Sequence, residues 1–232
     1  MGGYAGRRLA TLGLLISAGC TCLFVAIAAG VITGGPLTRL DLWVADALHA
    51  HASSAPVLTE AIRMVGAPGS IVALALVAVV VAAALLAQRR WSAFAAWLVA
   101  VVGGEALNLL LKDLFARPRP RFEHPLVVET SYSFPSGQAM ESLVVYGMLA
   151  YFAVLILRGS GKRAFFVVGA AVLVVLIGFG RVYLGAHYLS DVVGGFAAGG
   201  AWLGAVIAYW DKMGRRNVDS RRGRANPPWT SS

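Results

Sequence analysis

Five residues between positions 112 and 181 have groups suited to binding an oxyanion. Lys112, Arg119 and Arg181 supply positive charge. Ser136 and Gly137 lie in a Pro-Ser-Gly turn before an apolar run, and they offer a hydroxyl and closely approachable backbone N–H groups. These are the groups that bind a phosphoryl group. A single Lys or Arg near a helix end is usually an interfacial cation, but that interpretation does not explain the turn.

His187 is the candidate nucleophile, and Asp191 follows it by four residues. On a helix, this spacing lets the carboxylate accept a hydrogen bond from the far ring N–H and fix the imidazole tautomer. Two other histidines, His49 and His51, lie two residues apart and point in different directions on a helix. We therefore expect no metal and no other cofactor.

The segments that carry these residues are apolar enough to cross a membrane. Apolar residues make up 58% of the chain before glycine is counted, against roughly 45–50% with glycine in soluble domains. Uncharged runs at 9–32, 71–87, 164–180 and 192–210 approach or exceed the ~20 residues of a spanning helix. Two further runs, 91–111 and 139–157, each carry one glutamate. We expect an all-α, polytopic membrane protein with six transmembrane helices.

Most of the 20 lysine and arginine residues fall on one side of these six spans. The positive-inside rule then predicts cytoplasmic N- and C-termini. The basic residues on the other side of the membrane concentrate between positions 112 and 121, where two of the candidate site residues lie. The candidate site is therefore predicted to be extracytoplasmic, at the surface of a cell membrane. Cytoplasmic loops facing anionic lipid account for the net charge of +9, and nucleic acid is not an expected partner.

The segments outside the spans have patterns of their own. Residues 38–50 and 54–66 are predicted to be short amphipathic extracytoplasmic helices, the first with a capping box at Thr38 and Asp41. Each of these two short helices is expected either to interact with lipid or to cap the helix bundle. Residues 1–210 form one predicted transmembrane domain, and 211–232 a basic, disordered cytoplasmic tail. The apolar run at 9–32 is longer than a signal peptide's, so we expect a retained anchor, with cleavage as the alternative.

Three spaced blocks resemble motifs of the type 2 phosphatidic acid phosphatase family of integral membrane enzymes. The family's K-x6-R-P block is matched from Lys112 to Pro120, P-S-G-H is approached from Pro135 to Gln138, and S-R-x5-H-x3-D is matched from Arg181 through His187 to Asp191. The resemblance implies a phosphohistidine mechanism without a metal. His187 would attack phosphorus, Asp191 would orient it, and the Lys, Arg and Ser groups would hold the phosphoryl oxygens. The histidine of the second block would protonate the leaving oxygen and then activate water.

Two positions depart from the family pattern. Gly180 replaces a serine and loses one hydroxyl contact to phosphate. Gln138 replaces the histidine of the second block. An amide can hydrogen-bond an ester oxygen but has no titratable proton, so the predicted loss is about 10²- to 10⁴-fold for the missing general acid. His124 and Glu141 are the candidates to replace it, although a Glu at 141 is more often paired with an Arg.

Glu105, Asn108 and Lys112 share one helical face, at spacings of three and four residues. Glu105 is therefore predicted to point into the bundle and to pair with Lys112 or a neighbouring Arg. This favours a supporting role over a direct catalytic one.

We expect a membrane lipid phosphatase that acts on a polyprenyl diphosphate, phosphatidylglycerol phosphate or phosphatidate, impaired by Gln138. The alternative is a non-catalytic protein that binds lipid phosphates. A transporter is disfavoured because the polar residues gather at one surface instead of near the bilayer midplane. The expected partners are the phosphorylated lipid and the bilayer, and the oligomeric state stays open.

Overall fold

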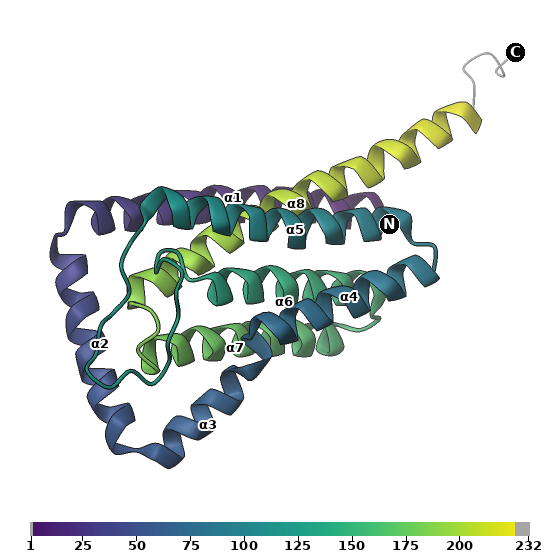
Figure 1. The fold of residues 1–232 in the computed structure, drawn as a ribbon. Coiled ribbons are helices and arrows are strands. Elements are labelled where there is room, and N and C mark those ends of the chain that lie inside the picture. The colour runs from purple at the N-terminus through teal and green to yellow at the C-terminus, as the bar shows by residue number, and fades with distance from the viewer. Residues whose placement is uncertain (1, 226–232) are drawn as a thin grey trace, which may run out of the picture.

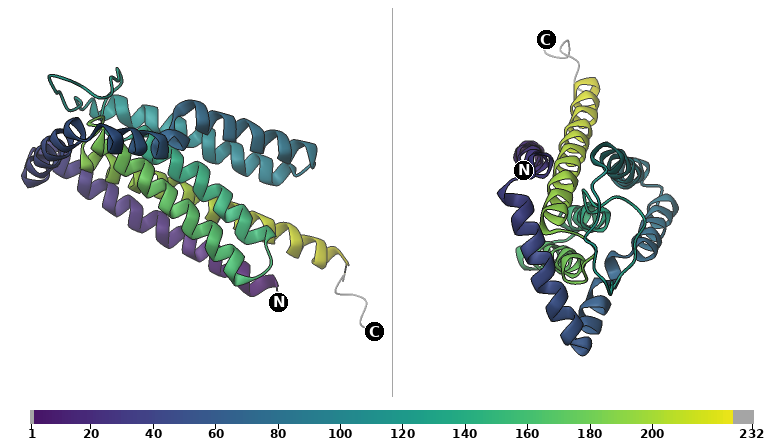
Figure 2. Two further views of the ribbon diagram at one scale, coloured as in Figure 1. Left: turned by 90° about the horizontal axis from the view of Figure 1, so that it is seen from below. Right: turned by 60° about the vertical axis from the view of Figure 1, so that its left-hand side comes forward.

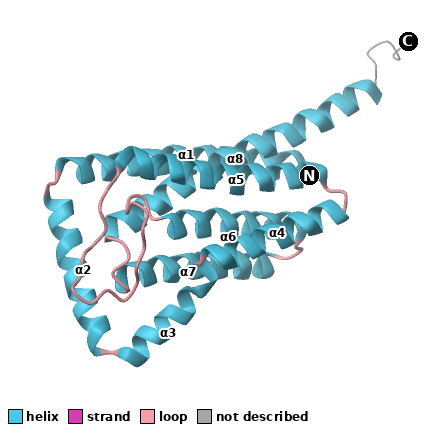
Figure 3. Cartoon of the chain, in the orientation of Figure 1, coloured by secondary structure: helices cyan, strands magenta, loops and turns pink. Residues whose placement is uncertain are grey.

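A computed structural model describes residues 2–225 of the chain. These residues form helices joined by loops, with no strand among them (Figure 3), as predicted for an all-α protein. The helices are α1 (Gly2–Thr33), α2 (Pro36–Ser54), α3 (Pro56–Gly66), a short 3-10 turn (Ala67–Gly69), α4 (Ile71–Ala87), α5 (Trp91–Phe115), α6 (Gly137–Ile156), α7 (Ser160–Tyr183) and α8 (Leu189–Ala225).

Six stretches of helix within the described residues are long and apolar enough to cross a membrane, which confirms the predicted number. They are Leu9–Thr33, Pro56–Ala87, Trp91–Phe115, Gly137–Ile156, Ser160–Tyr183 and Leu189–Met213. The second stretch is longer than the predicted 71–87 because α3 and the 3-10 turn lead directly into α4. The chain is a multi-pass membrane protein.

Helices α6 and α8 lie side by side in the middle of the bundle, with α1 on one flank and α4 and α5 on the other (Figure 2). The α8 span is the most buried of the six. Helix α1 packs closely along α8 because glycines meet at the contact: a Cβ on Gly13 would lie 2.8 Å from the carbonyl oxygen of Gly204. Small residues allow membrane helices this approach. The central position of α8 holds its first turn rigidly at one end of the bundle.

The polar segments gather at that same end. Helix α2, helix α3 and the long loop 116–136 cover it, whereas the N-terminus and the C-terminal half of α8 lie at the opposite end (Figure 1). The loop joins the end of α5 to the start of α6 and passes over the ends of α7 and α8. One end of the bundle therefore holds every candidate site residue.

Both short helices predicted before the second span are present as α2 and α3. The capping box is wrong: α2 begins at Pro36 after Gly35, and no side chain caps its N-terminus. Proline suits the first helical position because its missing N–H needs no partner there. Asp41, which the pattern placed in the box, is instead fully buried.

The predicted disordered tail begins at residue 211, inside α8, which continues to Ala225. Residues 226–232 lie outside the described residues. The extent of a disordered segment and the domain boundary at 210 stay predictions.

Candidate active site

The candidate residues come from six segments that meet at the loop-covered end of the bundle. Lys112 lies in the last turn of α5, and Arg119 follows in the loop 116–136. The turn Ser136–Gln138 opens α6, with Ser136 as its N-cap residue. Arg181 lies in the last turn of α7, His187 between α7 and α8, and Asp191 in the first turn of α8.

The imidazole of His187 is buried, with a partner on each ring nitrogen. Nδ1 lies 2.9 Å from the carbonyl oxygen of Ser133, and Nε2 lies 3.1 Å from a guanidinium nitrogen of Arg119. A carbonyl only accepts a hydrogen bond and a guanidinium only donates one. Nδ1 therefore carries the proton, and the lone pair of Nε2 is directed toward Arg119. Burial lowers the pKa of His187 to about 4, since Asp191 only partly offsets it and Arg119 and Arg181 add to it.

Asp191 does not hold the ring by the direct hydrogen bond that its spacing predicts. Its Oδ2 lies 3.6 Å from Nδ1 of His187, beyond hydrogen-bond distance. The carboxylate instead accepts hydrogen bonds from the Ser133 hydroxyl at 2.5 Å and the Tyr188 backbone N–H at 2.9 Å. Asp191 thus positions Ser133, whose carbonyl oxygen is the nearer acceptor for His187.

Two buried ion pairs of Arg117, absent from the sequence-based prediction, support Asp191. Arg117 donates to Asp191 at 2.5 Å and to Asp41 of α2 at 2.8 Å. Asp41 also accepts hydrogen bonds from the backbone N–H of Ser190 at 2.8 Å and from its hydroxyl. The guanidinium carbon of Arg117 lies 4.4 Å from the centre of the Tyr188 ring. The charged groups are therefore fully paired, as buried charges must be.

The sequence does contain a pattern that indicates burial of Asp41. Asp41 precedes Val44 and Leu48 by three and seven residues, so it falls on the same face of α2 as two partly buried apolar side chains. A carboxylate on a buried face requires a cation. Which of the loop arginines provides it could not be inferred from spacing.

Arg119 and Arg181 converge on one carboxylate, that of Glu129 in the loop. Arg119 lies 3.2 Å from one Glu129 oxygen, and Arg181 binds the other. Burial alone would raise the pKa of Glu129, but Arg181 and Arg119 outweigh burial and lower it, so the group is ionised. Two guanidinium groups sharing one carboxylate form a site for an oxyanion. Glu129 was not identified from the sequence.

Unpaired donors surround the same region. Among the described residues, Nε of Arg181 and the hydroxyl of Ser136 are buried without a hydrogen-bond partner. The first backbone N–H groups of α6, which starts at Gly137, have no intrahelical acceptors. Lys112 donates to the Tyr132 carbonyl oxygen at 2.5 Å, which holds its ammonium beside the loop. Buried donors without acceptors are what a phosphate group would satisfy.

The two candidates to replace the histidine missing at Gln138 differ in their surroundings. His124 is exposed in the loop. Glu141 lies one turn after Gln138 on α6, and its carboxylate accepts a hydrogen bond from Asn108 at 3.3 Å. No ion pair between Glu141 and an arginine is present among the described residues, so the expected pairing is wrong.

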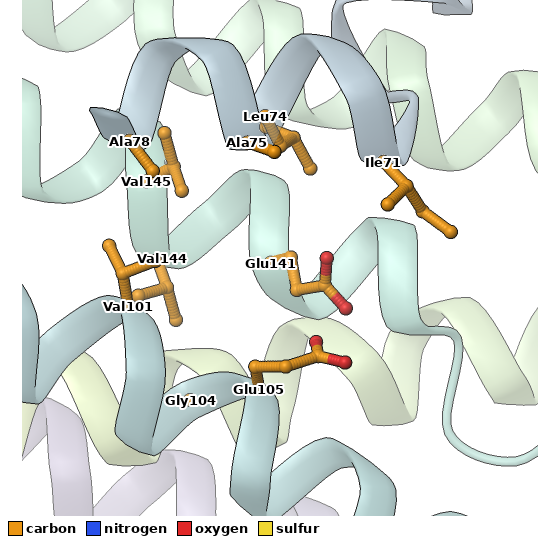
Figure 4. Close-up of a pocket in the computed structure, with 10 residues that line it drawn as sticks. All are labelled: Ile71, Leu74, Ala75, Ala78, Val101, Gly104, Glu105, Glu141, Val144 and Val145. Carbon is orange, nitrogen blue, oxygen red and sulfur yellow. The ribbon is translucent and has the colours of Figure 1, made fainter. Parts of the chain in front are cut away.

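Glu105 also departs from its predicted pairing, because Lys112 donates to Tyr132 instead. Figure 4 shows the Glu105 and Glu141 side chains directed toward the same space, in a pocket between α4, α5 and α6. The two carboxylates are neighbours in the fold.

In the described part of the chain, no group of three or more His, Cys, Asp or Glu side chains lies close enough together to hold an ion. The His49 ring stacks on Phe122 with centroids 3.7 Å apart, which gives it a packing role.

Comparison with known proteins places these features in context. Residues 93–215 match the PAP2 superfamily. Phosphatidylglycerophosphatase B of Bacillus subtilis is 42% identical over 111 residues, 47% of this chain and 54% of that protein. Decaprenylphosphoryl-5-phosphoribose phosphatase of Mycobacterium tuberculosis is 35% identical over 119 residues, 48% of this chain and 59% of that protein. The chain spans about half the length of these curated relatives.

A solved structure extends the similarity to most of the chain. The crystal structure of a transmembrane PAP2 type phosphatidylglycerolphosphate phosphatase from Bacillus subtilis superposes with a TM-score of 0.73 and 30% sequence identity. The match covers 87% of this chain and 96% of that one. It therefore includes segments outside the region that the family comparison matches.

Proposed function

The chain belongs to the PAP2 superfamily, and from that premise we propose that it hydrolyses a phosphate monoester or diphosphate of a membrane lipid. The observation that carries the proposal is the Nε2 lone pair of His187, directed at Arg119 in a cluster of buried cations. A neutral imidazole with its other nitrogen anchored is suited to attack phosphorus. Lysine and arginine side chains that merely extend to the membrane interface would not place a guanidinium against a buried imidazole in this way.

The proposed reaction has two displacements. Nε2 of His187 forms a bond to phosphorus while the bond from phosphorus to the leaving oxygen breaks. The products are a phosphohistidine and either a lipid alkoxide, which takes up a proton to become the alcohol, or, from a diphosphate, the lipid monophosphate. Water then attacks phosphorus and loses a proton as the phosphorus–nitrogen bond breaks, and inorganic phosphate leaves with His187 restored. Nδ1 keeps its proton throughout, because the Ser133 carbonyl oxygen faces it.

The cations stabilise the charge that develops on the phosphoryl oxygens. Arg119, Arg181 and Ser136 are the proposed ligands, with Lys112 and the Gly137 N–H beside them. Arginine suits this role because its planar fork binds two oxygens at once. Glu129 would leave the two guanidinium groups when a phosphate binds.

Phosphatidylglycerol phosphate is the first substrate to test, because the names of the Bacillus subtilis relative and of the superposed structure refer to it. Phosphatidate and a polyprenyl diphosphate are the other members of the proposed class. The headgroup would reach the loop-covered end while the chains stay in the bilayer. We place that end on the extracytoplasmic side and both termini in the cytoplasm, since the basic residues favour this orientation.

Gln138 supports a second candidate function, a lipid-phosphate-binding protein without turnover. Its amide cannot give up a proton, so the step that releases the lipid oxygen is impaired unless another group supplies one. Binding does not need that proton. Phosphate release distinguishes the two functions.

The test is phosphate release from the three lipids by the full chain in vesicles, compared with His187→Ala. We expect release by the chain as written and none by the variant, because His187 is the proposed nucleophile and alanine has no group that can bond to phosphorus. Equal release by both would contradict the proposal.

A binding measurement on the same vesicles separates the second candidate. Arg181→Ala should weaken binding of phosphatidylglycerol phosphate relative to phosphatidylglycerol. Selective binding with no release in either protein would favour the lipid-phosphate-binding function. Equal affinity for both lipids in both proteins would rule out a phosphate site.

A further inference from the structure

A pocket of ≈270 Å³ lies between α4, α5 and α6, next to the start of α6. Apolar residues form its walls, among them Leu74, Val101 and Val144. The carboxyl groups of Glu105 and Glu141 are its polar members (Figure 4). Glutamates in an apolar membrane pocket are costly, and such residues are functional more often than not.

In the described part of the chain, neither glutamate forms an ion pair. Lys112, the nearest lysine along α5, attracts Glu141 only from beyond ion-pair distance, and its ammonium is bonded to the Tyr132 carbonyl oxygen. Two negative charges side by side among apolar walls repel strongly, and sharing one proton relieves the repulsion. The pair therefore has a proton to give.

The carboxyl group of Glu141 lies beside Gly137, the first residue of α6. A Cβ added to Gly137 would lie 3.3 Å from Oε1 of Glu141 and 2.8 Å from Nδ2 of Asn108. The carboxyl group thus lies alongside the backbone whose N–H groups face the proposed phosphate. Only a glycine leaves room for this approach.

Unsatisfied polar atoms mark the same place. Asn108 is 2% exposed, and its Oδ1 has no partner among the described residues. Oε2 of Glu105 is likewise buried and unpartnered in that part of the chain. Buried polar atoms without partners are rare outside catalytic groups and water sites. A pocket of this size also has room for water, which takes up about 30 Å³ per molecule.

We propose that Glu141, sharing a proton with Glu105, protonates the leaving lipid oxygen in place of the histidine that Gln138 replaces. The inference rests on the proposed phosphatase function. As Nε2 of His187 bonds to phosphorus, the phosphorus–oxygen bond to the lipid breaks, and the oxygen takes the proton of Glu141. The Glu141 carboxylate then accepts a proton from the water that attacks the phosphohistidine. Phosphate leaves, and both residues return to their starting states.

The experiment compares Glu141→Gln with Glu123→Gln, a matched control. Glu123 is an exposed glutamate of the loop 116–136, away from the pocket. With phosphatidylglycerol phosphate in vesicles, Glu141→Gln should lower the steady-state rate by about 10²-fold or more, the contribution of a general acid. Glu123→Gln should leave the rate unchanged.

A rescue variant separates proton donation from a structural role. Gln138→His introduces an imidazole at the family's general-acid position, and it should restore activity to the Glu141→Gln chain. Histidine at 138 has no means of repairing a packing defect in the pocket. The restored rate would also show that the Glu141→Gln chain is folded.

Leaving-group chemistry supplies a second measurement. A diphosphate lipid expels a phosphate monoester, whose second ionisation lies near ~6, whereas a monophosphate lipid expels a strongly basic alkoxide. Glu141→Gln should therefore slow the monophosphate far more than the diphosphate. Equal slowing of both would overturn the assignment.

The remaining outcomes separate the inference from the function on which it rests. If Glu141→Gln keeps full activity while His187→Ala has none, the phosphatase stands and Glu141 is not the proton source. Glu141 is also excluded if the chain as written is inactive and Gln138→His alone activates it, or if the double variant stays inactive. If no variant, including Gln138→His, releases phosphate, the proposed function itself fails.

Discussion

The two nitrogens of His187 face groups of opposite hydrogen-bonding character, the Ser133 carbonyl oxygen and the Arg119 guanidinium. Each partner comes from the loop 116–136, so the loop conformation determines the protonation of the ring. Asp191 acts on the ring indirectly. Its carboxylate accepts a hydrogen bond from the Ser133 hydroxyl, and its negative charge lies 3.6 Å from Nδ1 of His187. The chemistry at this residue therefore depends on a backbone carbonyl that no residue type encodes.

This environment leads to a prediction about pH. The pKa of His187 is about 4, lowered from 6.5 chiefly by burial. Because the folded-state pKa is depressed, the ring stays neutral as pH falls through 6.5 and gains its proton only near 4. Protonation costs the folded state, so any stability linked to the neutral ring is lost as pH falls from about 6.5 toward 4. The neutral ring of His187 is thus present across the range from weakly acid to neutral pH.

Ring ¹⁵N NMR of the protein in micelles measures this directly. The signals that disappear in His187→Ala identify the residue among the four histidines. Between pH 7 and pH 5 we expect these signals to move by only about a tenth of the full protonation shift, since pH 5 still lies about one unit above the pKa of His187. A titration midpoint near 6.5 would contradict the burial argument.

At the scale of elements, helix α2 is tied to the start of α8 by charge. Asp41 binds Arg117 and Ser190, and Arg117 continues to Asp191. These contacts give a physical basis for the predicted role of α2 as a cap on the bundle, because its buried carboxylate, Asp41, belongs to the ion-pair network that includes Asp191. Contact with lipid by its exposed face, which includes Trp43, is compatible with that role.

Asp41→Asn tests the connection. The substitution removes the charge that accepts hydrogen bonds from Arg117 and Ser190, while Arg117 keeps Asp191 as a counter-ion. A hydrogen bond to a charged group is worth about 1.5–3 kcal/mol. We expect a loss of this order in the free energy of unfolding in micelles, together with a lower rate of phosphate release. Asp46→Asn, at an exposed position of the same helix, is the control. A difference between the two variants of less than about 0.5 kcal/mol, the usual range of surface changes, would mean that the network does not anchor α2.

At the scale of the whole molecule, the bundle separates its two ends. Loop 116–136, α2 and α3 lie at one end, and the turn between α4 and α5 and the chain's N-terminus lie at the other (Figure 1). All the site residues belong to the first end. A substrate headgroup would therefore be processed at one membrane surface only.

The proposed orientation makes that surface extracytoplasmic, and cysteine labelling checks it. In a chain with Cys20 and Cys22 replaced by serine, a cysteine at Glu123 should react with an impermeant reagent added to intact cells. A cysteine at Ser160, at the start of α7, should react only after the membrane is opened. The positive-inside distribution is the physical reason. The opposite labelling pattern would invert the topology.

The sequence by itself determined the elements and the residue types available to them. Run length and hydropathy predicted the six spans, because a helix needs about 20 apolar residues to cross the bilayer. Spacing predicted that Lys112, Arg181 and Asp191 would lie near the ends of three helices, and the structure places them there.

Only the tertiary structure decided which polar groups meet. Arg117 joins Asp41 and Asp191 across 76 and 74 residues of sequence, and Glu141 lies against Asn108 across 33. Period and composition state which face of a helix is apolar, but they do not state which neighbour that face will contact. The capping box at Thr38 and the pairing of Glu105 with Lys112 were wrong for this reason. Local spacing allowed both, but in the bundle Asp41 binds Arg117 and Lys112 donates to the Tyr132 carbonyl oxygen. The arrangement of the charges is therefore a property of the assembled bundle.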